Sequence, residues 1–127
     1  MSCVRSRNHR SGFTLVEIMI VVAVIGLLAA MAVPGFVIAR KRSQGRRVLN
    51  DARQMDSAVD QWAMEYNKMH GATVDTVAAG TYLKKGWKTN DVLGNNFVLN
   101  NVGTGQIQIS TTTKIELSGV NIDWGPY

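Results

Sequence analysis

The chain has 127 residues, 46% of them hydrophobic, which leaves room for one modest domain and excludes a multidomain protein. Its single cysteine, Cys3, excludes an internal disulfide, and its two histidines form no cluster for a transition metal. Without Arg5, Arg7 and Arg10 near the N-terminus, the formal charge falls from +5 to +2. The basic isoelectric point therefore does not indicate a nucleic-acid partner.

The N-terminal part of the chain combines a short basic leader with a long apolar run. Residues 18–39 carry no charged or strongly polar side chain. About 20 apolar residues suffice for a helix to cross a bilayer, so this run can span a membrane. Glu17 lies at its start, where a charge in hydrocarbon costs at least about 2.5–3.5 kcal/mol and is rarely kept without a partner. We therefore expect either that this helix leaves the bilayer or that it packs against a group that neutralises Glu17.

The apolar run is interrupted at Gly26 and at the Pro34-Gly35 pair. Proline inside a helix removes one backbone hydrogen bond and clashes with the carbonyl one turn earlier. We therefore expect a kink or a local melt over residues 30–34, with the helix resuming after Pro34.

The next segment has the spacing of an amphipathic helix. Its apolar residues recur at intervals of three and four, which places them on one face, while most charged residues occupy the other faces. Gly71 after His70 is a plausible C-terminal stop. The face comprises Val48, Ala52, Met55, Val59, Trp62, Tyr66 and Met69.

Turn and strand signals follow Gly71. The secondary structure of residues 76–83 is ambiguous. One interpretation is a short helix that leads to a strand or loop. Residues 97–99 and 106–109 predict an antiparallel hairpin or meander. The alternation in the second strand directs Ile107 and Ile109 toward the long helix. Residues 110–117 fit a third strand or a short helix capped by Ser110, and we favour the helix. Trp124 and Tyr127 are expected to fold back on the core. The predicted class is α+β.

The sequence offers no catalytic machinery. No serine, histidine and carboxylate are spaced as a nucleophilic set, and the Gly103-Thr104-Gly105 fragment lacks the third glycine and the helix of a phosphate-binding loop. We expect a protein that is not an enzyme and needs neither a cofactor nor a metal.

The stretch Gly12-Phe13-Thr14-Leu15-Val16-Glu17, followed by a long apolar helix, resembles the N-terminal signal of type IV pilins and type II secretion pseudopilins. The resemblance implies that a prepilin peptidase cleaves between Gly12 and Phe13 and methylates the new amine of Phe13. It also implies that Glu17 pairs with that amine on a neighbouring subunit during assembly. Gly26 and Pro34 match the positions between which pilin helices loosen in filaments.

The resemblance divides the chain into three parts: a cleaved leader (1–12), a transmembrane and assembly half-helix (13–39), and a small head (40–127). The head would contain an amphipathic helix at about 40–70, then the sheet and a C-terminal segment. The subunit would lie in the cytoplasmic membrane as a single span with its leader in the cytoplasm, then enter a pilus or pseudopilus. The partners implied are the prepilin peptidase, other pilin subunits, membrane lipid and the assembly platform protein, whereas nucleic acid is not expected.

Two departures from the family pattern bear on the role. Many pilins close a C-terminal loop with a disulfide, which this chain cannot form. Residues 91–97 resemble the turn of major secretion pseudopilins, although Val92 replaces the proline of that turn. Acidic oxygens are too sparse near this turn to infer a calcium site. A secretion pseudopilin is therefore favoured over a pilus subunit for adhesion, motility or DNA uptake.

Other interpretations of the N-terminal segment remain open. A secretory signal peptide has a shorter apolar core of about 7–15 residues, and Ala29, Ala30 and Ala32 could imitate its cleavage site. A monomeric, single-span membrane-anchored binding module would keep its leader and form no filament. A minor pilin for DNA uptake is a further alternative.

Five cations follow the apolar run closely, and they could form a solvated helix face or bind lipid headgroups, nucleic acid or acidic faces of neighbouring subunits. The last of these is our expectation, with carboxylates such as Asp51, Asp56 and Asp60 of neighbours as partners. The five cations are Arg40, Lys41, Arg42, Arg46 and Arg47.

Overall fold

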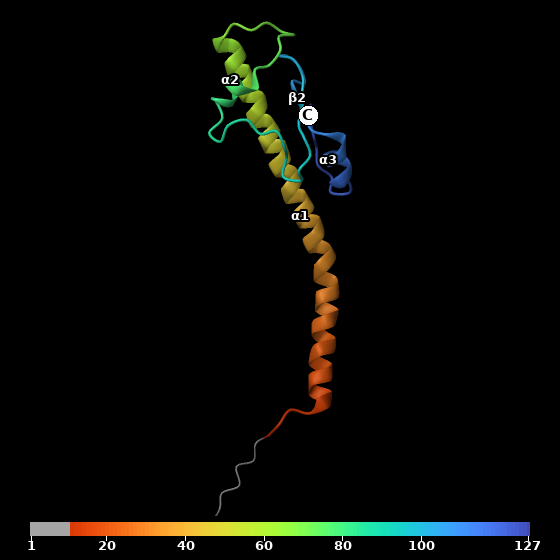
Figure 1. The fold of residues 1–127 in the computed structure, drawn as a ribbon. Coiled ribbons are helices and arrows are strands. Elements are labelled where there is room, and N and C mark those ends of the chain that lie inside the picture. The colour runs from red at the N-terminus through yellow and green to blue at the C-terminus, as the bar shows by residue number, and fades with distance from the viewer. Residues whose placement is uncertain (1–10) are drawn as a thin grey trace, which may run out of the picture. The chain divides into compact units, whose positions relative to one another are not determined.

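The computed structural model describes residues 11–127, so Cys3, Arg5, Arg7 and Arg10 lie outside the described residues. The element order is α1, α2, β1, β2 and α3 (Figure 1). By their internal contacts the residues form two units, one ending at Phe36 and the other comprising Val37–Tyr127. The α+β class predicted from the sequence is confirmed.

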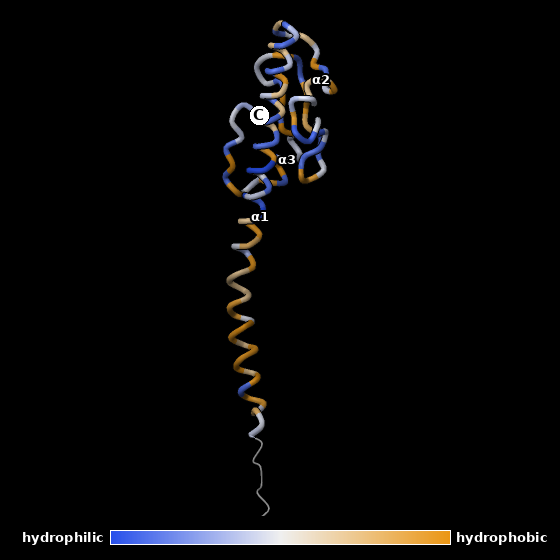
Figure 2. Tube along the Cα trace, turned by 90° about the vertical axis from the view of Figure 1, so that its left-hand side faces the viewer, coloured by the Kyte–Doolittle hydropathy of each residue, from blue (hydrophilic) through white to orange (hydrophobic). Residues whose placement is uncertain are grey.

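Helix α1 (Leu15–Glu65) includes the whole apolar run, and Figure 2 shows its first half as mostly hydrophobic. Residues 11–40 are all exposed. Among the described residues, α1 is the one helix long and apolar enough to cross a membrane, judged by length and composition. Its apolar side chains have no cover within the protein, so water is a poor environment for them.

The helix is continuous through Gly26 and Pro34, so the kink or melt expected near Pro34 is not found as an interruption of α1. Proline removes only one backbone hydrogen bond, and the bonds of the flanking turns can keep the helix intact. Loosening of this segment inside a filament stays a prediction.

The amphipathic face predicted for the second half of α1 forms the core of the head. Five of its seven residues are at most 3% exposed, and each packs in the main hydrophobic cluster. Tyr66 and Met69 are 56% and 82% exposed, so the face ends earlier than the spacing predicted. The buried five are Val48, Ala52, Met55, Val59 and Trp62.

The C-terminal end of α1 was predicted at His70-Gly71, and this was wrong because a local cap ends the helix at Glu65. Asn67 adopts the left-handed conformation, with φ 50°. The Lys68 N–H donates to the Ala63 carbonyl at 2.8 Å, the bond that defines a Schellman cap. Asparagine tolerates this conformation better than most residues, which explains a stop without glycine.

The short helix that the sequence allowed after Gly71 is α2 (Thr76–Gly80). Asp75 caps it by accepting hydrogen bonds from the N–H groups of Val77 and Ala78 at 2.9 and 3.1 Å. In Figure 1 the loop after α2 lies on one side of α1, and β2 and α3 lie on the other.

The predicted hairpin is confirmed. Strands β1 (Val98–Leu99) and β2 (Ile107–Gln108) are antiparallel, with Val98 opposite Gln108 and Leu99 opposite Ile107. Ile107 and Ile109 are 1% and 3% exposed and belong to the core cluster, as the alternation predicted.

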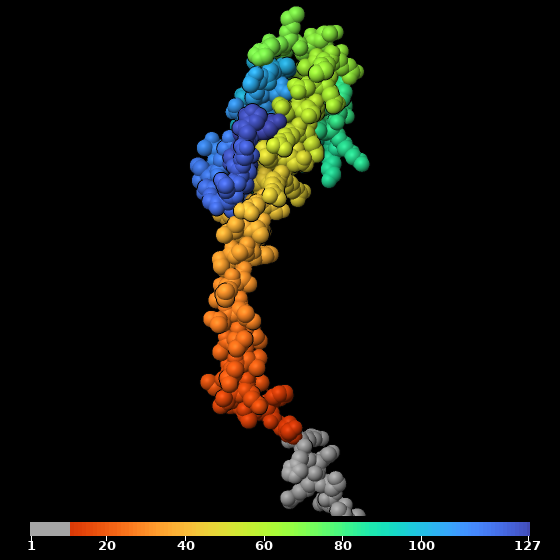
Figure 3. Space-filling view, turned by 180° about the vertical axis from the view of Figure 1, so that it is seen from behind, coloured from red at the N-terminus to blue at the C-terminus, as the bar shows by residue number. Residues whose placement is uncertain are grey.

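Residues 110–117 form helix α3 (Thr111–Glu116), with Ser110 as its N-cap, which confirms the helical interpretation. The C-terminal segment then returns to α1 (Figure 3), where Trp124 and Tyr127 pack on the core as expected. Gly45 permits this approach, because a Cβ at that position would overlap Ile122 Cδ1.

Candidate processing and assembly site

The predicted cleavage bond lies just before α1. Gly12 and Phe13 precede the helix in a segment without regular structure, and Phe13 is 87% exposed. A Cβ built on Gly12 would meet no atom within 4 Å. The bond between these residues is therefore sterically open to an enzyme.

Thr14 and Glu17 form a reciprocal cap at the start of α1. The Thr14 N–H donates to Glu17 Oε2 at 2.8 Å, and the Glu17 N–H donates to Thr14 Oγ1 at 3.2 Å. This is a capping box, which satisfies two backbone donors that the first helical turn leaves free. The role of Thr14 was missed in the sequence, although the Thr-x-x-Glu pattern before an apolar run is a known signal for it.

The capping box leaves the charge of Glu17 without a compensating cation. Among residues 11–127 the one ion pair joins Lys88 and Asp51, so Glu17 has no cationic partner in that part of the chain. A carboxylate held by one backbone N–H keeps further lone pairs free to accept from an amine.

The five cations after the apolar run lie on α1, and all except Lys41 are exposed. The carboxylates expected to serve as their partners on neighbours are engaged within the chain. Asp51 is buried and paired with Lys88, Asp56 accepts a hydrogen bond from the Tyr127 hydroxyl, and Asp60 accepts one from Gln106. Asp51 is therefore not an intersubunit partner, while Asp60 remains exposed and can accept further bonds.

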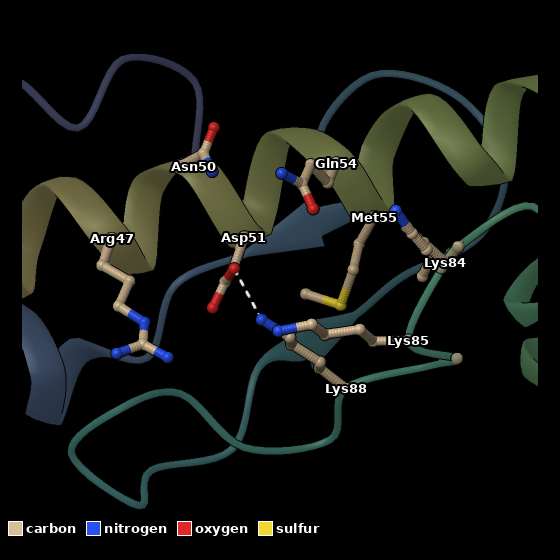
Figure 4. Close-up of a pocket in the computed structure, with 10 residues that line it drawn as sticks. Arg47, Asn50, Asp51, Gln54, Met55, Lys84, Lys85 and Lys88 are labelled. Carbon is tan, nitrogen blue, oxygen red and sulfur yellow. Dashed lines mark ion pairs between the residues drawn. The ribbon is translucent and has the colours of Figure 1, made fainter.

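A groove of about 400 Å³ runs between α1 and residues 83–88 (Figure 4), and we call it the basic groove. Arg47, Asp51, Gln54 and Met55 line it from α1, where they share one face. Three lysines line it from the loop, and one of these, Lys88, forms the ion pair with Asp51 at 2.7 Å. The loop lysines are Lys84, Lys85 and Lys88.

The turn at residues 91–97 is fixed by Asp91. Its Oδ1 accepts hydrogen bonds from the N–H groups of Leu93 and Asn95 at 2.8 and 3.0 Å. Its Oδ2 accepts a bond of 2.5 Å from the hydroxyl of Thr113, which lies on α3 and is fully buried. Residues 11–127 contain no group of three or more potential metal ligands, at this turn or elsewhere.

Comparison with known proteins adds one finding on the N-terminal segment and one on the whole chain. A family model described as the prokaryotic N-terminal methylation motif matches residues 7–33, which include Gly12, Phe13 and Glu17. The solved structures include no match to the chain.

Curated relatives come from two kinds of system. The type IV major fimbrial protein FimA of Dichelobacter nodosus is 35% identical over 88 residues, which are 69% of this chain and 48% of that protein. The type II secretion system core protein G of Escherichia coli (strain K12) is 27% identical over 113 residues, 78% of this chain and 77% of that protein. Fimbrial protein Q of Moraxella bovis is 45% identical over 53 residues, 42% and 34% of the two chains. The chain thus spans about half the length, or less, of the fimbrial relatives.

A chain with an N-terminal methylation motif that extends into an apolar helix, and with a small head of helices and an antiparallel hairpin, falls in the class of proteins that carry this motif. The fimbrial and secretion relatives indicate which family within that class the chain resembles. These findings support the type IV pilin and type II secretion pseudopilin family, in agreement with the resemblance seen in the sequence.

Proposed function

We propose that this chain is a structural subunit that polymerises through its N-terminal helix into a filament of the pilus or pseudopilus kind. One observation carries the proposal: the matched methylation motif, residues 7–33, extends into a helix whose apolar part is 0% buried within the protein. Such a surface needs lipid or other subunits around it. The role is assembly and requires no catalytic group, cofactor or metal.

Processing precedes assembly in this proposal. A prepilin peptidase cleaves the open bond between Gly12 and Phe13 and methylates the Phe13 amine. The arginines of the leader hold it in the cytoplasm, in keeping with the positive-inside trend, and the head lies on the outer side of the membrane. The assembly platform protein then moves the subunit from the membrane into the filament.

Glu17 acts in assembly by accepting the Phe13 amine of a neighbouring subunit. Its carboxylate has no cationic partner among residues 11–127. An unpaired charge inside the hydrocarbon of a membrane is energetically costly. Pairing with an amine reduces that cost where both groups are desolvated together. The segment between Gly26 and Pro34 is where α1 loosens as lipid is replaced by other helices.

Within this role we favour a secretion pseudopilus over a pilus. The match to the secretion core protein G of Escherichia coli covers 77% of that protein, whereas the match to FimA covers 48%. The small head and the turn at residues 91–97 fit the same choice. A pilus subunit, including one for DNA uptake, is the second candidate because a fimbrial protein shares higher identity, 45%, over a shorter match of 53 residues.

The test is filament formation in cells that carry the assembly system, seen by electron microscopy. We expect Glu17→Gln to abolish or greatly reduce filaments while leaving cleavage intact. Thr14→Val is the matched control, because it removes the hydroxyl half of the capping box and keeps the carboxylate. Normal filaments from Glu17→Gln would contradict the assembly role of Glu17. A chain that stays monomeric and retains its leader would support the anchored binding module instead.

A further inference from the structure

The cations that directly follow the apolar run of α1 have no partner that the proposed function supplies. Figure 2 shows the change along α1 from hydrophobic to hydrophilic residues at this level. Residues 18–50 contain no carboxylate, and no cation of residues 40–47 forms an ion pair within residues 11–127. Asp123 lines the same hollow as Arg42 and Arg46 but pairs with neither. We call these five residues the basic collar: Arg40, Lys41, Arg42, Arg46 and Arg47.

The basic collar surrounds α1 instead of following one of its faces. Successive residues of an α-helix point about 100° apart, so Arg40, Lys41 and Arg42 point in three different directions. Arg46 returns close to the direction of Arg42, and Arg47 lies close to the direction seven residues before it. A neighbouring helix contacts one face, whose residues are spaced by three and four. A layer that encloses the helix contacts all of these directions at once.

The basic collar also begins at the level of a bilayer surface. Residues 18–39 measure about 33 Å as a helix, close to the hydrocarbon thickness of about 30 Å. The headgroup layer adds about 5–8 Å on each side, and residues 40–42 lie about 2–5 Å beyond Ala39. The first three cations therefore fall within the layer of headgroups.

The last two cations, Arg46 and Arg47, lie about 10–12 Å beyond Ala39 along α1. Side chains on a helix tilt toward its N-terminus, which for α1 is the side of the apolar run. A long arginine side chain that lies along the helix in this way carries its guanidinium back toward the headgroups. The whole collar is thus directed at one layer.

The charge of the collar selects the kind of headgroup. Guanidinium groups bind phosphate oxygens with two parallel hydrogen bonds, which makes phosphate a matched ligand. A zwitterionic headgroup adds a cation of its own that repels the collar, whereas phosphatidylglycerol offers the phosphate alone. Clusters of about four to eight Lys and Arg residues beside a membrane span are typical of anionic lipid binding.

We propose that the basic collar binds the phosphates of anionic phospholipids, of the phosphatidylglycerol kind, in the leaflet from which the head emerges. The inference rests on the single membrane span of the proposed function and adds the lipid class around the end of that span. The contact holds the start of the head at the bilayer surface before assembly, and it breaks when the subunit leaves the membrane.

Lipid retention tests the contact in the full chain and does not require filaments. The chain is placed in bilayers of equal phosphatidylglycerol and phosphatidylcholine and then extracted, and native mass spectrometry counts the lipids that stay bound. The wild type should retain more phosphatidylglycerol. The triple variant Arg40→Gln, Lys41→Gln and Arg42→Gln should lower the ratio of the two lipids by about fivefold or more, the factor that about 1 kcal/mol for a single cation gives. Arg40→Lys with Arg42→Lys keeps the charge and should keep most of the preference.

The matched control removes three cations outside the collar, with Arg53→Gln, Lys84→Gln and Lys85→Gln. All three residues are exposed, and Arg53 lies about 21 Å beyond Ala39 along α1. The net charge falls by the same amount in both triple variants, and the leader is the same in both. The control should therefore keep the lipid ratio of the wild type.

The outcomes separate this inference from the proposed function. A lipid ratio that falls no further in the collar variant than in the control would overturn the inference, and filaments of the wild type would leave the proposed function standing. Loss of filaments in the collar variant with an unchanged lipid ratio would also overturn it and assign the collar to a contact between subunits. A collar-dependent lipid ratio in a chain that never forms filaments would overturn the polymerisation alone. A chain that does not enter bilayers would overturn both.

Discussion

Lys88 Nζ lies 2.7 Å from Asp51 Oδ1, and this ion pair joins the loop after α2 to the face of α1. The Asp51 side chain is 8% exposed and that of Lys88 is 34% exposed. A carboxylate at that depth is tolerated because the lysine neutralises it while remaining partly in water. The pair therefore fixes where the loop that carries Lys84 and Lys85 lies.

Removing the lysine should cost more than removing both charges. Lys88→Met leaves Asp51 buried without a partner, and we expect a loss of about 2–3 kcal/mol in the free energy of unfolding, below the 3–5 typical of fully buried pairs. Asp51→Asn combined with Lys88→Met should recover most of that loss. Urea unfolding of the detergent-solubilised chain measures both, with Lys85→Met as a control expected within about 0.5 kcal/mol of wild type. Equal stability of Lys88→Met and wild type would contradict this role of the pair.

The hydroxyl of Thr113 holds the turn at residues 91–97 against α3. Thr113→Val keeps the shape of the side chain but removes the donor to Asp91, so we expect a loss of about 1.5–3 kcal/mol. Thr112→Val, at an exposed position of the same helix, should change stability by no more than about 0.5 kcal/mol. A similar small effect for both variants in thermal unfolding would show that the hydrogen bond does not secure the turn.

The cap of α1 depends on the left-handed conformation of Asn67. Asn67→Gly should be neutral or slightly stabilising, because glycine adopts positive φ without steric cost. Asn67→Val should cost about 1–2 kcal/mol, since its Cβ branches clash in that conformation. The comparison is a urea titration of the two variants. Tolerance of valine would mean that the helix does not end in this cap.

The phenol of Tyr82 should lose its proton at a higher pH than a free tyrosine. Its hydroxyl donates to the Glu65 carboxylate, and this hydrogen bond, with some desolvation, raises the pKa of Tyr82 from 10.0 to about 12. The neutral phenol is favoured in the folded state, so its contribution to stability is present below pH 10 and lost as the pH rises toward 12. Tyrosinate absorbance measures the titration, and Glu65→Gln should shift it to lower pH. An unchanged titration in that variant would contradict the assignment to Glu65.

The periodic parts of this chain were predictable, and the caps and polar contacts were not. The spacing from Val48 to Trp62 reports a buried face directly, because burial selects apolar side chains every three or four residues. The end of α1 depends instead on which residue forms its cap: Asn67 and Gly71 both have positive φ, 50° and 90°, and the cap forms at Asn67. Asp51 was expected to pair with cations of a neighbouring subunit, because the partner that allows its burial, Lys88, lies far along the sequence.

The processing and assembly site also combines features that the sequence predicts with features that it does not. Gly12, Phe13 and Glu17 could be selected from the sequence because the basic leader, the glycine and the carboxylate occur together before an apolar run. The capping role of Thr14 was also predictable, because Thr14 and Glu17 have the spacing of a capping box. It was not predicted, because the same residues form part of the processing signal. What Glu17 contacts in a filament depends on a second chain, and a single sequence does not contain that geometry.

The central claim is that this chain is processed and assembled as a pilin-like subunit, and the mass of the mature protein tests it most directly. Intact-mass and N-terminal peptide analysis of the protein from membranes of cells with a prepilin peptidase should show a chain that begins with N-methylated Phe13. A chain that still carries its leader, or one cleaved after the alanines at 29–32, would contradict the claim.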